Sequence, residues 1–194
     1  MEHCQQSNLC TQKANGHKRK MKSIGLQHVG IMLLSTALNV WACPGSQATV
    51  HAQCQMIVVF DQPCNDVREE IAARIASVDW IDPHNQGIYS LLDSESQDIL
   101  SGKRLSGNKK YTDLFDFTFL NLADSSGCTV EACSESQVTS ILDFDTNYCN
   151  LHNLYCNSEN ENCQVISHEL SYSEQYSNCW QRNVDSCISA QASS

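Results

Sequence analysis

The sequence predicts an α+β domain, in which an antiparallel meander is covered on one face by a helix and followed by a disulfide-rich C-terminal region. Three observations lead to this prediction. Short segments alternate apolar and polar side chains, as half-buried strands do. One segment repeats its apolar residues at helical spacing. Seven of the 12 cysteines lie at position 128 or beyond, where disulfides can hold a loop-rich region.

The first expected strand covers residues 49–60, because its apolar side chains recur at every second position. The residues on the apolar side are Val50, Ala52, Cys54, Met56, Val58 and Phe60. An expected helix follows, with Asn65 and Asp66 at its start and an apolar stripe formed by Val67, Ile71, Ile75 and Val78. Within it, Glu70 is placed to pair with Arg74. We expect the helix to end near Val78.

Three further strands are expected at residues 88–92, 98–105 and 111–122, the last two joined by a turn at Gly107-Asn108. Phe115, Phe117 and Phe119 share one face of the last of these strands. Because the helix has one apolar stripe, it covers one sheet face, and the three Phe side chains should be buried beneath it together with the first strand. Beyond Cys128 the chain consists of short polar stretches between cysteines, with a final strand expected at residues 165–172.

The cysteines are interpreted as disulfide partners, since their density is typical of proteins from oxidising compartments. The candidates are Cys54, Cys64, Cys128, Cys133, Cys149, Cys156, Cys163, Cys179 and Cys187. A zinc site is disfavoured because the chain has no C-x-x-C pair. We therefore expect no metal site and no cofactor. If Cys149 to Cys156 form one helix, these two thiols are too far apart to pair with each other.

An export signal is expected at residues 21–48, preceded by an N-terminal extension at 1–20 and followed by one domain at 49–194. The basic run at 18–22 precedes a short apolar stretch at 29–40, as in a signal peptide. Cleavage after Ala48 would start the mature chain at Thr49; cleavage after Ala42 would start it at Cys43. The later cut leaves nine cysteines and the earlier one ten, an even set that favours Cys43 mildly. An uncleaved anchor is disfavoured because the apolar stretch is short.

The chain carries a formal charge of −10. Removing residues 1–48 takes away five of 12 basic and one of 22 acidic residues, which leaves a domain of charge −14. Nucleic acid is therefore an unsuitable partner, since phosphate binding needs a basic surface. The remaining basic cluster, Lys103-Arg104 with Lys109-Lys110, is interpreted as a solvated hairpin end.

Two local patterns resemble known sites without completing them. Residues 143–147 have the D-x-D-x-N rhythm of a calcium loop, but Tyr148 and Leu154 occupy the positions where an EF-hand needs Gly and Glu. An Asx-rich turn is the favoured interpretation. The segment with His152 between Cys149 and Cys156 is similar to the helix of secreted phospholipases A2. It has Asn153 where that family has its calcium-binding Asp, so the resemblance implies no such activity and His152 is interpreted as a surface residue.

Two longer stretches are distinctive, residues 82–89 (DPHNQGIY) and residues 133–151, from Cys-Ser-Glu-Ser-Gln to Asn-Tyr-Cys-Asn-Leu. They resemble signatures of a group of small secreted cysteine-rich eukaryotic proteins. That resemblance implies no activity and no site residue. Catalytic residues stay unknown, because the chain lacks a G-x-S-x-G elbow and its histidines at 51, 84, 152 and 168 are scattered over unrelated segments.

These patterns together predict a secreted, acidic, cysteine-rich binding or structural protein; the alternative is an extracellular hydrolase. The expected partner is an unknown extracellular protein or small ligand, with no nucleic acid and no membrane after signal cleavage.

Overall fold

The computed structural model describes residues 43–94, 96–121, 126–160 and 162–188. The chain divides into two units, residues 1–38 and 39–194, and all described residues belong to the second. The expected extension at 1–20 and most of the expected signal peptide at 21–48 lie outside the described residues. Within the described ranges, no helix has both the length and the apolar character needed to cross a membrane.

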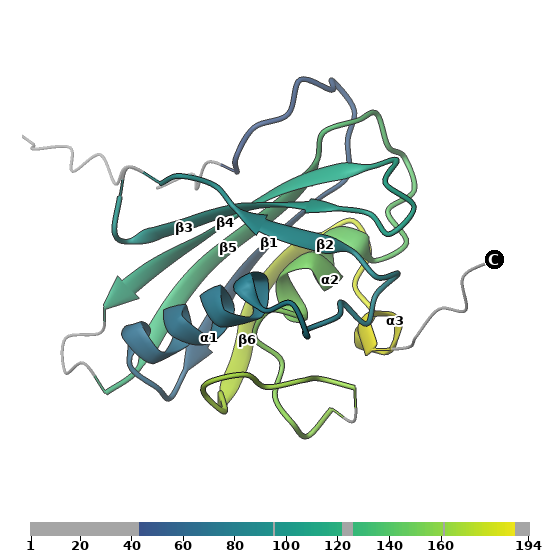
Figure 1. The fold of residues 1–194 in the computed structure, drawn as a ribbon. Coiled ribbons are helices and arrows are strands. Elements are labelled where there is room, and N and C mark those ends of the chain that lie inside the picture. The colour runs from purple at the N-terminus through teal and green to yellow at the C-terminus, as the bar shows by residue number, and fades with distance from the viewer. Residues whose placement is uncertain (1–42, 95, 122–125, 161, 189–194) are drawn as a thin grey trace, which may run out of the picture. The chain divides into compact units, whose positions relative to one another are not determined.

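The described residues form six strands and three helices (Figure 1). In chain order these are β1 (Gln53–Phe60), α1 (Cys64–Ala76), β2 (Ile88–Leu91), β3 (Ile99–Leu105), β4 (Thr112–Asn121), β5 (Cys128–Ser136), α2 (Thr146–His152), β6 (Tyr172–Cys179) and α3 (Val184–Ile188). The strands make one antiparallel sheet in the order β2-β3-β4-β5-β1-β6. The α+β class is confirmed, and β2 to β4 form the expected meander, which β5 extends by one unpredicted strand.

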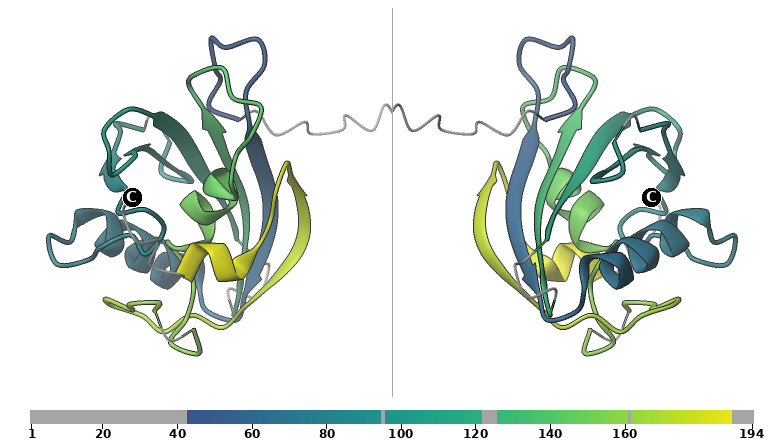
Figure 2. Two further views of the ribbon diagram at one scale, coloured as in Figure 1. Left: turned by 90° about the vertical axis from the view of Figure 1, so that its right-hand side faces the viewer. Right: turned by 90° about the vertical axis from the view of Figure 1, so that its left-hand side faces the viewer.

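All three helices lie on the same face of the curved sheet (Figure 2). Helix α1 packs on β2, β4 and β5, while α2 packs on β1, β4 and β5. The core between these layers contains the predicted residues Cys54, Met56, Val58, Val67, Ile71, Ile75, Phe115, Phe117 and Phe119. Val50 was wrongly assigned to this core: it is 48% exposed, because β1 begins only at Gln53.

The predicted end of the helix is also wrong, and so is the prediction of short polar stretches after Cys128. Helix α1 ends at Ala76, so Val78 is 94% exposed, and Trp80 is buried instead. Strand β5 lies where short polar stretches were expected, and its inward positions include the small polar side chain of Ser134.

The last strand begins at Tyr172, where the predicted strand at 165–172 ends. The segment before it cannot join the sheet because its backbone is used elsewhere. The amides of Ile166, Ser167 and His168 donate to the carboxylate of Glu70 at 2.9, 2.6 and 2.7 Å.

Five disulfides join the ten described cysteines. The pairs are Cys43–Cys133, Cys54–Cys179, Cys64–Cys128, Cys149–Cys187 and Cys156–Cys163. Cys149 and Cys156 pair with other cysteines, as expected, although α2 ends at His152 and the continuous helix assumed for that expectation does not form. Cys43 lies before the expected start at Thr49, yet it holds the segment preceding β1 to the sheet.

Candidate functional site

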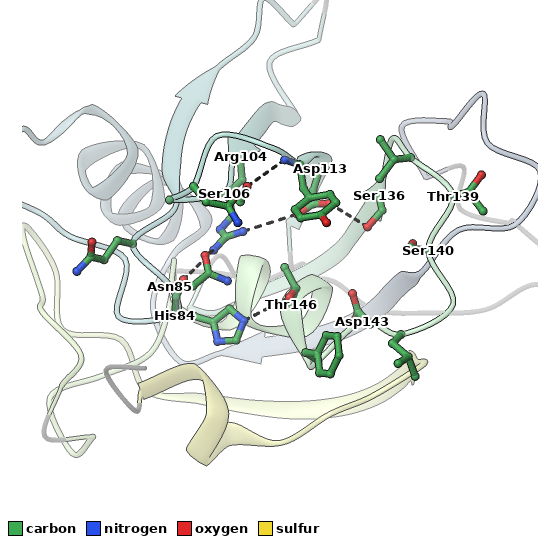
Figure 3. A pocket seen from close by; sticks show the side chains of 17 residues that line it. His84, Asn85, Arg104, Ser106, Asp113, Ser136, Thr139, Ser140, Asp143 and Thr146 are labelled. Atoms are coloured by element: carbon green, nitrogen blue, oxygen red, sulfur yellow. Dashed lines mark hydrogen bonds and ion pairs between the residues drawn. The ribbon is translucent and has the colours of Figure 1, made fainter. Parts of the chain in front are cut away.

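A pocket of about 630 Å³ opens on the helix-bearing side of the sheet (Figure 3). Its wall comes from three connections: the loop between α1 and β2, the turn between β3 and β4, and the loop between β5 and α2. The lining residues that matter below are His84, Asn85, Arg104, Tyr111, Asp113, Ser136, Asp143 and Phe144. Parts of both distinctive sequence stretches, 82–89 and 133–151, thus meet at one cavity.

Arg104 supplies the positive charge of the pocket wall, and its side chain is fully buried. One edge of the guanidinium is saturated: Nε and Nη2 donate to Asp82 Oδ2 at 3.1 and 2.8 Å, and Nη2 also donates to His84 O and Asn85 Oδ1. The other edge is not. Its Nη1 lies 3.8 Å from Asp113 Oδ2, too far for a hydrogen bond, and has no hydrogen-bond partner among the described residues.

The Asp82 carboxylate organises the loop that holds Arg104. Its Oδ1 accepts from the His84 amide and from Asn153 Nδ2, and its Oδ2 accepts from the Gly87 amide. Gly87 is needed for this packing, because a Cβ there would overlap the Arg104 guanidinium. In the Asp-Pro-His-Asn-Gln-Gly stretch, the loop backbone therefore folds around the Asp82 carboxylate, and this carboxylate binds the buried Arg104 side chain.

Asn147 on α2 anchors the opposite wall. Its Nδ2 donates to Asp143 Oδ1 at 2.8 Å, to Ser136 Oγ at 3.1 Å and to the carbonyl of Ala52 at 3.2 Å. Its Oδ1 accepts from Ser134 Oγ at 2.8 Å. One amide side chain thus joins α2, β5, the loop before α2 and the segment before β1.

Asp113 on β4 connects this network to Arg104. Its Oδ1 accepts from Ser136 Oγ at 2.9 Å, and its Oδ2 accepts from Asn150 Nδ2 at 2.9 Å. Asn150 also donates to Ser134 Oγ at 3.0 Å. The polar residues of the 133–151 stretch therefore fix the carboxylate that faces the free edge of Arg104.

Asp143 does not form the calcium loop that its neighbourhood suggested. The carboxylate accepts from the backbone amide of Asn147, in the first turn of α2, and from its side chain. Burial raises the pKa of Asp143 to about 6, although the hydrogen bonds from Asn147 oppose this shift. Over the described ranges, no three His, Cys, Asp or Glu side chains are grouped to hold a metal ion. The D-x-D-x-N segment leads into α2, and the Asp143 carboxylate binds the amide four residues on, whereas the Asx-turn that was favoured would bind the amide two residues on.

Exposed apolar side chains surround the mouth of the pocket. Tyr111 is 53% exposed and Phe144 is 66% exposed, and Val138 and Leu142 lie on the same rim. Phe144 has a φ of +51°, a conformation that bulky residues rarely adopt. The Gln181 side chain holds it there, because Oε1 accepts from the Phe144 amide at 2.6 Å.

The structure does not bring the four histidines together. His51 contacts Glu135, His152 contacts Glu174 and His168 contacts Glu69, each at about 3 Å, but at separate places. Only His84 lines the pocket, where Nδ1 lies 2.8 Å from Ser186 O and Nε2 lies 3.3 Å from Thr146 Oγ1. Burial lowers the pKa of His84, which leaves its ring neutral at pH 7.

His152 was wrongly interpreted as a surface residue, since it is 1% exposed. Its Nδ1 lies 3.1 Å from Glu174 Oε1, which also accepts from Tyr155 at 2.7 Å and from Tyr148 at 3.1 Å. Burial raises the pKa of Glu174, but the hydrogen bonds from His152 and Tyr155 and the charge of Arg182 outweigh it and hold the pKa at about 2. This cluster ties α2 to β6.

Arg104 itself was misread as part of a solvated hairpin end. The period-2 pattern of β3 contains the missed signal, because Leu100, Gly102 and Arg104 fall on the same inward side while Lys103 points outward. Asp113 was overlooked for the same reason: it precedes Phe115 by two positions and shares its buried face. The sequence could reveal the direction of these side chains but not the partners that make their burial tolerable.

No protein-family model matches the chain, and no curated protein is significantly similar to it in sequence.

Proposed function

We propose that this chain is a secreted binding module that takes a small polar molecule in the pocket beside Arg104. The observation that carries the proposal is the free edge of a buried guanidinium in a cavity wall. A buried donor without a partner costs about 1–3 kcal/mol. Other buried atoms of this network also lack a hydrogen-bond partner among the described residues, namely Tyr89 OH, Asn150 Oδ1 and Asn153 Oδ1, but their residues do not line the pocket. Arg104 does, so its unpaired Nη1 marks the place where a ligand atom completes the network.

The cavity also has the general character of a ligand site. Its volume of about 630 Å³ falls within the range of roughly 300–1,000 Å³ that is usual for small-molecule pockets. Its polar groups converge from three connections, each held by hydrogen bonds from backbone amides to side chains. The acceptors are Asp82 in the loop before β2, Ser106 and Asn108 in the β3–β4 turn, and Gln181 for the loop before α2. A site built in this way is preorganised and loses little free energy in ordering when a ligand binds.

The disulfides support the extracellular part of the proposal, since five such bonds persist mainly in oxidising compartments. They also bear on the two expected cleavage positions. A cut after Ala48 would remove Cys43 and leave Cys133 without its partner. We therefore favour a mature chain that starts at Cys43.

N-terminal sequencing and intact mass of the protein secreted by a eukaryotic host test this assignment. We expect a chain that begins at Cys43 and takes up alkylating reagent only after reduction. A product that begins at Thr49, or one that stays in the cell with free thiols, would contradict it.

A fragment screen by NMR tests the binding site. We expect small polar fragments to shift the backbone amides of Ser106, Asn108 and Thr139, three residues of the pocket wall. Fragments that leave these signals unchanged and collect elsewhere on the domain would contradict the proposal.

A hydrolase is the second candidate, and one observation favours it. Asp113 and Asp143 line the same pocket, and burial raises the pKa of Asp143 to about 6, which is typical of a carboxyl group that acts as a general acid. The two functions can be distinguished by incubating the protein for a long time with compounds that bind to it and then analysing these compounds by chromatography. Products that form with the native chain and disappear with Asp143→Asn would establish the hydrolase; unchanged compounds would leave the binding module.

A further inference from the structure

We propose that the ligand is a neutral carbohydrate, with one hydroxyl bridging Arg104 Nη1 and Asp113 Oδ2 and one sugar ring packed against Tyr111 and Phe144. The inference rests on the proposed binding function and specifies its ligand class.

The first argument comes from the gap between Arg104 and Asp113. The 3.8 Å between Nη1 and Oδ2 is too long for a direct hydrogen bond, and one oxygen atom about 2.8 Å from each would bridge them. Because Nη1 is buried, the pocket wall has to open slightly to admit that oxygen. That atom has to accept from the guanidinium and donate to the carboxylate. A hydroxyl does both. An anionic oxygen only accepts and would face Asp113 unfavourably, and an ammonium group only donates and would face Arg104 unfavourably.

The second argument is the charge of the wall. The positive charge of Arg104 is already compensated by Asp82, which lies 2.8 Å from it and is itself buried. Asp113 and Asp143 add further carboxylates to the lining, and the domain as a whole is strongly acidic. Phosphate, sulfate and carboxylate ligands are therefore repelled from a pocket whose arginine has no charge to spare.

The third argument is the rim. A sugar ring has apolar C–H faces between its hydroxyls, and these faces pack on aromatic rings that are open to solvent. Tyr111 and Phe144 both line the cavity and are largely exposed, so they offer such rings to a ligand. Phe144 is presented by a left-handed backbone conformation that the Gln181 side chain stabilises. Strain of this kind is maintained where the surrounding structure fixes it, and it clusters at functional sites.

The test uses the full chain secreted from a eukaryotic host, with saturation-transfer NMR and calorimetry as readouts. The neutral probes are methyl glucoside, methyl mannoside, cellobiose, maltose, lactose and diacetylchitobiose. Glucuronate and glucose 6-phosphate serve as anionic counterparts, and glucosamine as a cationic one. We expect at least one neutral probe to bind and to shift the guanidinium signals of Arg104, and the charged counterparts to bind more weakly.

Variants at the rim avoid the risk that a buried substitution unfolds the domain. Tyr111→Ala and Phe144→Ala should each weaken binding by about tenfold, because each removes one packed ring. Tyr111→Phe keeps the ring and should bind as the native chain does. Val78→Ala, which truncates an even more exposed apolar side chain outside the pocket lining, is the control and should change nothing.

Three outcomes would overturn the inference. They are preferred binding of an anionic or cationic counterpart, sugar binding that ignores both rim alanines, and no binding of any neutral probe. In each case the fragment screen decides whether the proposed function falls as well. If fragments bind in the pocket, the proposed binding function stands with another class of ligand. If no fragment binds there, both the proposed function and the carbohydrate inference are rejected.

Discussion

Two buried arginines on the same side of the sheet differ in how completely their hydrogen-bond donors are used. Arg74 on α1 donates through Nε to Glu70 Oε1 at 2.7 Å, and through Nη1 and Nη2 to the carbonyls of Asn153 and Cys156 at 2.9 and 2.8 Å. Arg104 on β3 has one edge saturated, while its Nη1 faces Asp113 at 3.8 Å and has no hydrogen-bond partner among the residues that the structure describes. When the chain itself uses the donors on both edges of a guanidinium, the arginine holds structural elements together. When one donor is left unpaired in a cavity wall, that donor is available to a ligand.

The largest effect is expected from removing the saturated arginine. Arg74→Met should lower the free energy of unfolding by about 3–5 kcal/mol, because Glu70 would stay buried without its counter-charge. Urea denaturation measures the loss. Arg68→Met, on the same helix but half-buried and packed over the Phe119 ring, is the control and should cost far less. Equal losses in the two variants would show that the Arg74 network is not special.

The second effect is a pH dependence of the free energy of unfolding that arises from the pocket and not from the Arg74 network. Burial raises the pKa of Asp143 from an ordinary 3.8 to about 6, so the folded state holds a proton that the unfolded state has released in this range. The stability contributed by this group is present below about pH 4 and is lost as pH rises to 6, by up to roughly 3 kcal/mol.

Thermal unfolding of the native chain and of Asp143→Asn between pH 4 and pH 6 measures that loss. The variant should show a flatter dependence, since its side chain does not titrate. Parallel curves for the two proteins would mean that Asp143 ionises with an ordinary pKa in the folded state.

The smallest of the three effects concerns the bridge beside Arg74. Cys156→Ala with Cys163→Ala opens a loop of only seven residues and should cost about 2–3 kcal/mol, since disulfides that close short loops restrict the unfolded chain least. Fragment binding at the Arg104 pocket should be unchanged in the folded fraction. A loss of binding in this variant would show that the two regions are coupled.

The elements that the sequence predicted correctly are those whose burial depends on local periodicity. Helix α1 and strand β4 place Val67, Ile71, Phe115 and Phe117 on one side by their own spacing, wherever the partner elements lie. This was sufficient for the fold class and for most of the core.

The candidate site could not be predicted in this way, because its residues are polar and their burial is tolerated only through distant partners. Arg104 finds Asp82 22 residues away, and Asn150 finds Asp113 37 residues away. Periodicity predicts which face of a strand or helix a side chain lies on, but it does not predict the group that this side chain contacts. The misplaced last strand has the same origin, since the amides that exclude residues 166–168 from the sheet are bound by Glu70, almost 100 residues earlier.

The position of β1 between β5 and β6 has a consequence for how the molecule is made. In a chain that enters an oxidising compartment from its N-terminal side, Cys54 arrives 125 residues ahead of Cys179. At roughly 5–20 residues per second, that interval is on the order of 6–25 s. During it Cys54 is a free thiol with Cys64 and then Cys128 within reach, and the sheet lacks its outermost strand. We therefore expect oxidative folding of this protein to include a step in which early wrong pairs are exchanged, and disulfide isomerase to speed the appearance of the finished sheet.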